Sequence, residues 1–175
     1  MLRPFLAIIF LLIIGFGKAQ DKMFWNENRK LVWEDFKSQT KPGTSQAAAT
    51  TFCGISYLLS SPTKKFTAKN VKIESFFVPS KSWAHQDHKT EMVLMHEQSH
   101  FDIAELFARK FRKIISDQIL DAKSLQKLYT AIYNDYKAYQ QDYETVTNHG
   151  RIREKQLEYS AKIDAEIKDL SDFKI

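Results

Sequence analysis

His96, Glu97 and His100 form the pattern His-Glu-x-x-His, whose residue types and spacing could carry out metal-dependent hydrolysis. On a helix, residues i and i+4 lie on the same face, about 6 Å apart, so both imidazoles could bind one zinc ion. The glutamate beside the first histidine could then reach a water molecule bound to that ion. In this chemistry zinc lowers the pKa of the water, and Glu97 accepts its proton as general base.

The two histidines also lie within the apolar face of an expected helix. In a chain of this composition, a chance His-Glu-x-x-His has odds of about one in a hundred. Buried imidazoles need partners, and a shared metal ion would serve both. We therefore interpret the pattern as a metal site rather than as two surface histidines. The apolar positions at helical spacing are Met92, Val93, Ile103, Ala104, Phe107, Phe111, Ile114 and Ile115.

A catalytic zinc ion usually has three protein ligands, so one more residue is required. His149 is the favoured third ligand, because it lies at a helix end beside Gly150, where a chain reversal could direct it toward another helix. Glu144 and His88 are the alternatives. The competing interpretation of His149 is an ordinary histidine that interacts with the C-terminal end of a helix dipole.

Two acidic residues follow the motif on the same expected helix. Glu105 lies five residues beyond His100 and so points about 140° away from it on an ideal helix. Asp102 is also turned away from the histidines. It is expected either to support the metal site from a second shell, through a contact with a neighbouring element, or to be a solvated or capping carboxylate.

The apolar pattern predicts an α+β fold in which a small antiparallel sheet lies beside about three helices. Thr90 can cap the motif helix, Ser124 can open the next one, and Gly150 suits its end. The second helix carries a stripe of tyrosines, which is typical of amphipathic packing. The expected elements are an antiparallel pair of strands within 47–59 and 66–78, and helices over about 90–116, 124–149 and 152–170.

The N-terminal residues predict an export signal, with a positive start, an apolar run over 5–14 and a small-residue cleavage site at 17–19. The apolar run is short for a membrane span. We expect cleavage after Ala19, which leaves residues 20–175 as a single soluble exported domain, periplasmic or secreted, with no stable membrane span. Loss of Arg3 and Lys18 lowers the formal net charge from +5 to +3.

The remaining composition excludes several classes of site. Lysines and arginines are spread among acidic residues, so no basic stripe predicts nucleic-acid binding. Cys53 is alone, which excludes an internal disulfide, and its apolar surroundings favour a small buried hydrophobe over a catalytic thiol. His85 and His88 precede the motif helix, and we interpret them as solvated loop residues rather than as metal ligands or substrate contacts.

Several segments of the chain resemble a bacterial family of uncharacterised proteins described as predicted secreted zinc-dependent proteases. The resemblance spans nearly the whole chain after residue 19. Ser99 stands where relatives are expected to carry glycine. The segments that carry the resemblance are the block from His96 to Glu105, the early Leu31–Phe36, the strand Gly54–Tyr57, Ser82–Trp83, and the block from Tyr143 to Gly150.

This resemblance implies a zincin-like metallopeptidase with one zinc ion per chain. His96 and His100 are then ligands, Glu97 is the base, and His149 gains weight as the third ligand. By analogy with zincins, the segment 77–83 is expected to lie along the substrate. Tyr143 is the candidate for stabilising the oxyanion of the tetrahedral state.

The leading functional hypothesis is therefore an exported zinc-dependent hydrolase whose substrates are peptides or proteins. A second hypothesis is a degenerate zinc protein that binds partners through its helices without catalysis. A third drops the metal and leaves an exported helical interaction domain. Cell-envelope amidase activity is also compatible with the motif, because zinc-activated water attacks many kinds of amide.

Overall fold

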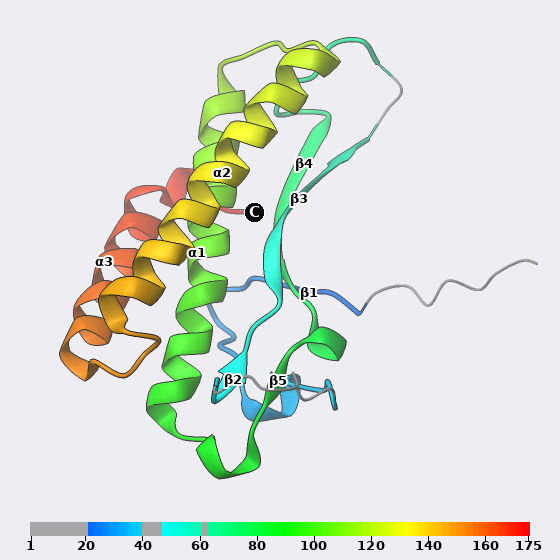
Figure 1. Cartoon of the computed structure of the whole chain (residues 1–175). Helices are drawn as coiled ribbons and strands as arrows, with labels where there is room; N and C mark the ends of the chain where they lie inside the picture. The colour runs from blue at the N-terminus through cyan, green and yellow to red at the C-terminus, as the bar shows by residue number, and fades with distance from the viewer. Residues whose placement is uncertain (1–20, 40–46, 61–62) are drawn as a thin grey trace, which may run out of the picture.

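Three helices lie on one side of a small antiparallel sheet, which confirms the predicted α+β fold (Figure 1). The computed structural model describes residues 21–39, 47–60 and 63–175. The main sheet has the strand order β1-β4-β3, and a second sheet pairs β2 with β5. The strands are β1 Met23–Phe24, β2 Ala49–Thr50, β3 Cys53–Leu59, β4 Val71–Phe77 and β5 Trp83–Ala84.

The predicted antiparallel pair is present, but both of its strands are shorter than the expected 47–59 and 66–78. β3 pairs with β4 from Cys53 opposite Phe77 to Leu59 opposite Val71. The expected strand over 47–59 is interrupted at Phe52, whose backbone N–H donates to the Ser82 hydroxyl at 2.9 Å. The two halves of this segment therefore belong to different sheets, because β2 pairs with β5 instead.

The helices begin and end close to the predicted positions. α1 covers Glu91–Ser116, and the Thr90 side chain accepts the N–H of Val93 as the expected cap. α2 covers Ala122–Thr147 and begins two residues earlier than expected, because Asp121 rather than Ser124 is the cap. α3 covers Arg153–Asp169. Short 3₁₀ helices are Trp33–Asp35, Pro79–Lys81, Gln86–His88 and Ser171–Phe173.

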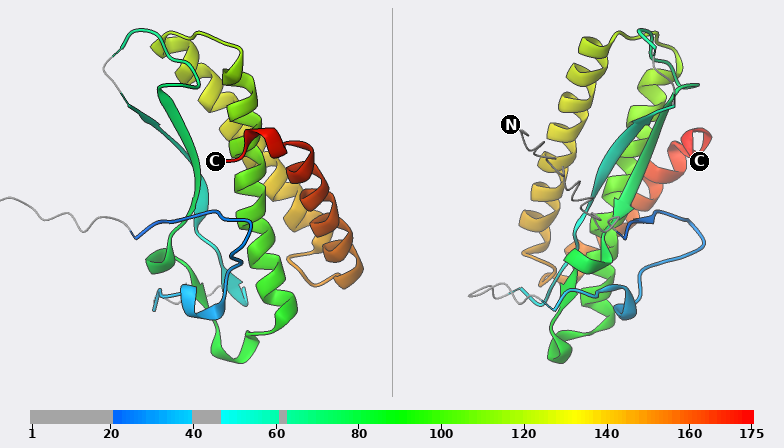
Figure 2. Two further views of the ribbon diagram at one scale, coloured as in Figure 1. Left: turned by 180° about the vertical axis from the view of Figure 1, so that it is seen from behind. Right: turned by 90° about the vertical axis from the view of Figure 1, so that its right-hand side faces the viewer.

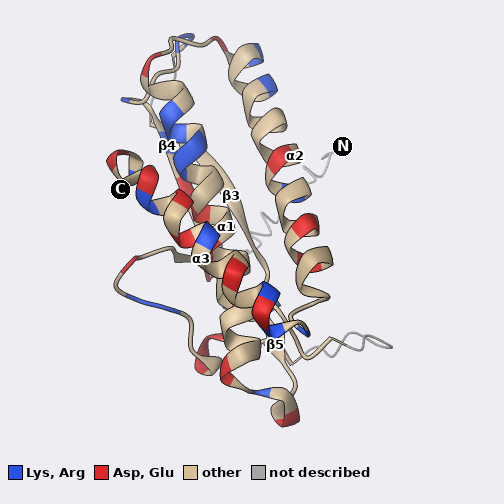
Figure 3. Cartoon of the chain, turned by 90° about the vertical axis from the view of Figure 1, so that its left-hand side faces the viewer, with Lys and Arg blue, Asp and Glu red and all other residues tan. Residues whose placement is uncertain are grey.

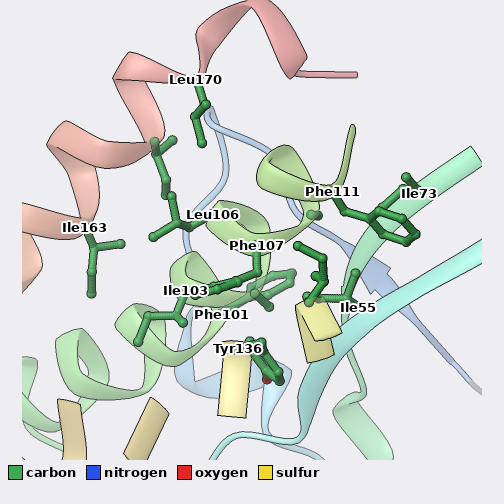
Figure 4. Packing of buried hydrophobic residues seen from close by; sticks show 14 of the residues in the cluster. Ile55, Ile73, Phe101, Ile103, Leu106, Phe107, Phe111, Tyr136, Ile163 and Leu170 are labelled. Carbon is green, nitrogen blue, oxygen red and sulfur yellow. The ribbon is translucent and has the colours of Figure 1, made fainter. Parts of the chain in front are cut away.

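α1 is the centre of the molecule, with the sheet on one side and α2 and α3 on the other (Figures 1 and 2). Phe101 and Phe107 face the sheet and α2 respectively, through ring contacts with Phe77 at 5.9 Å and Tyr136 at 6.1 Å. Figure 4 shows Phe101, Phe107 and Tyr136 close together in the core. The tyrosine stripe of α2 is therefore a packing surface, as the sequence predicted.

α1 and α2 run antiparallel, so the beginning of α1 lies beside the end of α2 (Figure 1). The short β2–β5 sheet lies at the same end of the molecule. This arrangement brings together the motif histidines, the last turns of α2 and the segment around β2. Because these segments are far apart in the sequence, only the folded chain forms a site there.

The predicted export signal, residues 1–19, lies outside the described residues, so it stays a prediction. Among the helices that are described, none is long and apolar enough to cross a membrane. Lysines and arginines alternate with acidic residues along α2 and α3 (Figure 3).

A buried ion network joins α1 to the sheet and to the C-terminal segment. Glu105 accepts hydrogen bonds from Ser75 of β4, from Arg109 and from Arg112. Arg109 also donates to the carbonyl of Ile167 at 3.0 Å. The Glu105 and Arg109 side chains are only 4% and 3% exposed. A buried pair of this kind is strongly destabilised when one partner alone is removed.

We predict that Arg109→Leu lowers the free energy of unfolding by about 3 kcal/mol, because Glu105 loses a charge partner in the interior. Denaturant unfolding measures this change. Arg153→Leu, at an exposed position of α3, is the matched control and should change stability by less than about 0.5 kcal/mol. Equal stability of the two variants would contradict a structural role for the network.

Candidate metal centre

The two motif histidines point their Nε2 atoms at the same place. His96 and His100 lie one turn apart on α1, and their Nε2 atoms are 3.2 Å apart. Their rings are nearly perpendicular, with centroids separated by 4.7 Å. His96 is buried and His100 is half-buried, at the end of α1 that borders α2. The helical spacing in the sequence thus produces the convergent pair that was expected.

Glu144 of α2 completes a group of three potential ligands. Its Oε1 lies 3.2 Å from the Nε2 of His100, and its Oε2 lies 3.5 Å from the Nε2 of His96. One donor atom from each of the three residues falls within a 4.8 Å group that could hold a metal ion. The sequence named Glu144 as an alternative third ligand, and the structure brings this residue to the histidines.

The donor atoms fit a tetrahedral metal ion. Ligand nitrogens at about 2.0–2.1 Å from a tetrahedral zinc ion are about 3.3 Å from each other. The Nε2 atoms of His96 and His100 are at nearly this separation, 3.2 Å. Two histidines and one glutamate are also a ligand set used by catalytic zinc sites. The residues that are present could therefore hold a metal ion of this kind.

Gln140 fixes the orientation of the His100 ring. Its amide oxygen lies 2.5 Å from the Nδ1 of His100, and its amide nitrogen donates to the His100 backbone carbonyl at 2.9 Å. Because an amide oxygen can only accept, the Nδ1 must carry the proton, and the lone pair of Nε2 then faces the centre. Nothing in the sequence pattern singled out Gln140, although it precedes Glu144 by about one helical turn.

Electrostatic interactions within the group favour an ion pair in the absence of metal. Burial favours neutral Glu144, but hydrogen bonds with His100 and His96 outweigh it and hold the pKa of Glu144 well below its ordinary value. Burial likewise opposes protonation of His100, yet its hydrogen bond with Glu144 and the negative charge of Glu97 raise its pKa. A bound cation would replace the proton that His100 carries in this ion pair.

His149 lies beside the group rather than within it. Its Nδ1 is 2.9 Å from Glu144 Oε2, and its side chain is 65% exposed. The chain reverses here through three consecutive residues with positive φ, Asn148, His149 and Gly150. The group of three donor atoms contains Glu144 and not His149. Ligation by His149 stays a prediction, and the contact in the structure is one that orients Glu144.

Tyr143 is a packing platform for the histidines. Its ring stacks on His96 at a centroid distance of 4.9 Å and meets the edge of His100 at 5.2 Å. Burial raises the pKa of the Tyr143 hydroxyl above its ordinary value, and interactions with the nearby Ser99 and Ser160 offset only part of this rise. Tyr143 is fully buried and does not line the cleft described below. Its proposed oxyanion role stays a prediction, and this position adds no support for it.

Glu97 occupies the wall of a cleft of about 610 Å³ that opens beside the three potential ligands. The residue is 4% exposed, and its Oε2 is buried without a hydrogen-bond partner among the described residues. The cleft is also lined by the segment 47–51, rather than by the segment 77–83 that was expected to lie along the substrate. The remaining lining residues are Val93, His149, Gly150 and Arg151.

Asp102 contacts a neighbouring element, but its printed partners are none of the three potential ligands, so its second-shell role at the metal site stays a prediction. Its carboxylate accepts hydrogen bonds from Trp25 at 2.6 Å and from Gln98 at 2.8 Å, and Lys30 forms an ion pair with it at 3.2 Å. The amide oxygen of Gln98 in turn accepts the Leu31 N–H. Asp102 therefore anchors the N-terminal segment and is buried rather than solvated.

The two histidines that precede α1 lie outside the group of potential ligands. His85 meets Trp83 edge-on at 5.4 Å, and its backbone N–H donates to the carbonyl of Ala48. His88 is exposed at the end of a short 3₁₀ helix. Neither residue lines the cleft. Cys53 is half-buried rather than fully buried, and desolvation raises the pKa of its thiol to about 12.

Residues 30–150 match a family described as "Bacterial protein of unknown function (DUF922)". The chain belongs to this family. The match confirms a bacterial family of uncharacterised function, and its description mentions neither zinc nor proteolysis. It includes His96, Glu97, His100 and Glu144 but ends before α3. No curated protein and no solved structure matches the chain.

We predict that Glu144→Ala weakens binding of a divalent transition metal by more than the roughly 10–100-fold that removal of an outer hydrogen-bond partner costs. His149→Ala should weaken it less, by about 10-fold, because the exposed His149 side chain contacts the group through Glu144. Competition with a chromophoric chelator measures both affinities. The opposite order of the two effects would make His149 the third ligand.

Proposed function

We propose that this DUF922 protein is an exported zinc-dependent hydrolase, and most specifically a peptidase. The observation that carries the proposal is the unpaired, buried carboxylate of Glu97 beside a His-His-Glu group in an open cleft. A zinc ion held by His96, His100 and Glu144 would acidify water and polarise a carbonyl oxygen. The sequence resemblance to predicted zinc-dependent proteases points the same way.

Within this proposal, each of the residues around the potential ligands has a separate role. Glu97 accepts a proton from the attacking water and later returns it to the leaving amine, which is the usual work of a general base that becomes a general acid. Gln140 holds His100 in the tautomer that ligation needs. Tyr143 supports both imidazoles from below, so the ligands are held in place before any substrate arrives.

An extended peptide is the substrate that the cleft suits best. Part of its lining consists of the small residues Ala47–Ala49 with Thr50 and Thr51, and the Thr51 hydroxyl donates to the backbone carbonyl of Glu97 at 3.3 Å. Two of these residues, Ala49 and Thr50, form strand β2. A zincin-like arrangement would place the substrate backbone along this strand. An amide of the cell envelope is the alternative substrate that uses the same chemistry.

We predict that Glu97→Gln keeps the metal affinity of the native protein but lowers kcat by about 10²–10⁴-fold, which is the usual contribution of a general base. Turnover of a peptide library, followed by mass spectrometry, supplies the measurement. Glu91→Gln is the matched control, because Glu91 is exposed in the first turn of the same helix. If Glu97→Gln hydrolyses as fast as the native protein, another residue is the base.

A native protein that holds zinc but cleaves no peptide or cell-envelope amide would favour a non-catalytic zinc protein. In that case the chelated protein would lose stability without any change in an activity. A native protein that binds no transition metal after reconstitution would remove the basis of the proposal.

Acidification should release the metal, because protons compete for His96 and His100. The raised pKa of metal-free His100 makes this competition begin at a higher pH than for an ordinary histidine, and affinity then falls steadily as the pH falls. Metal content after dialysis across a pH series tests the prediction. Zinc that is retained below about pH 4 would be incompatible with histidine ligation.

A further inference from the structure

Two buried polar atoms next to the metal centre lack hydrogen-bond partners and are complementary to each other. The Nδ1 of His96 and the amide oxygen of Gln156 are both shielded from solvent and both unpaired among the described residues. The Gln156 side chain is fully buried at the beginning of α3. Such atoms are costly in a protein interior, so each calls for an explanation.

The orientation of Gln156 is set by α1. Its amide nitrogen donates to the backbone carbonyl of Met92 at 2.7 Å. That carbonyl lies four residues before His96 and thus belongs to the same turn of the helix. Because the amide nitrogen is fixed by this bond, the amide oxygen points to the other side, where it can only accept a hydrogen bond.

Gly150 packs closely against both of these atoms. A Cβ at this position would lie 2.9 Å from the Gln156 oxygen and 3.0 Å from the His96 Nδ1, which is too close for a side chain. Each atom is thus about 3 Å from one point, so at most about 6 Å separates them. The backbone φ of Gly150 is +73°, and its N–H donates to the Thr147 hydroxyl at 3.1 Å. Glycine therefore allows the chain to pass beside both atoms, whereas a side chain would be strained and would collide with them.

The chemistry of His96 requires an acceptor at this point. Its Nε2 faces His100 and Glu144, so ligation through Nε2 leaves the ring proton on Nδ1. Histidine ligands almost always donate this second N–H to an acceptor, which fixes the ring and raises its basicity. His100 has Gln140 for this purpose, whereas the unpaired acceptor within about 6 Å of His96 Nδ1 is the amide oxygen of Gln156.

We propose that Gln156 is the positioning residue of His96 and accepts a hydrogen bond from its Nδ1–H, directly or through one bridging water. Each histidine of the centre is then oriented by a glutamine from a different helix. This inference rests on the proposed zinc site. It also assigns α3, which lies beyond the residues matched by the family, a part in metal binding.

The experiment compares zinc affinities of full-length variants by chelator competition, together with thermal unfolding of the metal-free proteins. Gln156→Met removes the acceptor at similar side-chain size and should weaken zinc binding by about 10–100-fold. Gln156→Glu keeps an acceptor oxygen and should bind zinc more tightly than Gln156→Met. Gln140→Met is the positive control, and Glu154→Met at an exposed position of α3 is the negative control.

Native affinity in Gln156→Met, or equal losses in Gln156→Met and Gln156→Glu, would overturn the inference. Equal losses would mean that only the bond to Met92 matters. If Gln156→Met does not fold, nuclear magnetic resonance of the zinc-loaded native protein decides, because the His96 Nδ1 proton should be present and exchange slowly. Its absence would overturn the assignment. If the native protein binds no zinc while the variants fold normally, the proposed function itself fails.

Discussion

The structure depends on the polar side chains of a helix that is buried on almost every side. α1 lies between the sheet and the other two helices. Between His96 and Arg109 it carries seven polar or charged side chains that are buried. Buried polar groups must find partners, or they destabilise the fold. Each neighbouring segment therefore packs against α1 by apolar contact and is held in place by a specific polar bond.

Polar residues at successive positions along α1 form hydrogen bonds with different neighbouring segments. Asp102 holds the N-terminal segment, and Glu105 with Arg109 holds β4 and the C-terminal residues. Ser99 shares a hydrogen bond with Ser160 of α3. The atoms of the helix that keep no partner, His96 Nδ1 and Glu97 Oε2, are next to the cleft. Satisfied polar groups build the scaffold, whereas unsatisfied ones mark the place where chemistry is expected.

Antiparallel packing of α1 and α2 makes the centre a property of two helices rather than of one motif. The early turns of α1 supply the imidazoles, and the late turns of α2 supply Gln140, Tyr143 and Glu144 on one face. Attraction between Glu144 and the histidines holds this group together without metal. A centre that is oriented beforehand loses little freedom on binding an ion or a substrate.

The sequence by itself determined the elements and half of the centre. Helical spacing placed His96 and His100 on one face, and alternation gave the antiparallel pair of β3 and β4, because both depend on the local geometry of the chain. It did not predict the break in the first expected strand, where a hydrogen bond from Phe52 to the distant Ser82 divides the segment.

Only the tertiary structure decided which residues surround the histidines. Gln140 lies 40 positions from His100, and Gln156 lies 64 positions from the Met92 carbonyl that orients it. No periodicity records contacts at such separations. His149 looked favourable because it ends a helix beside a glycine, but the antiparallel crossing sets the residue one turn earlier, Glu144, opposite the histidines. Side-chain type and spacing predicted the chemistry, whereas the packing of two helices selected its partners.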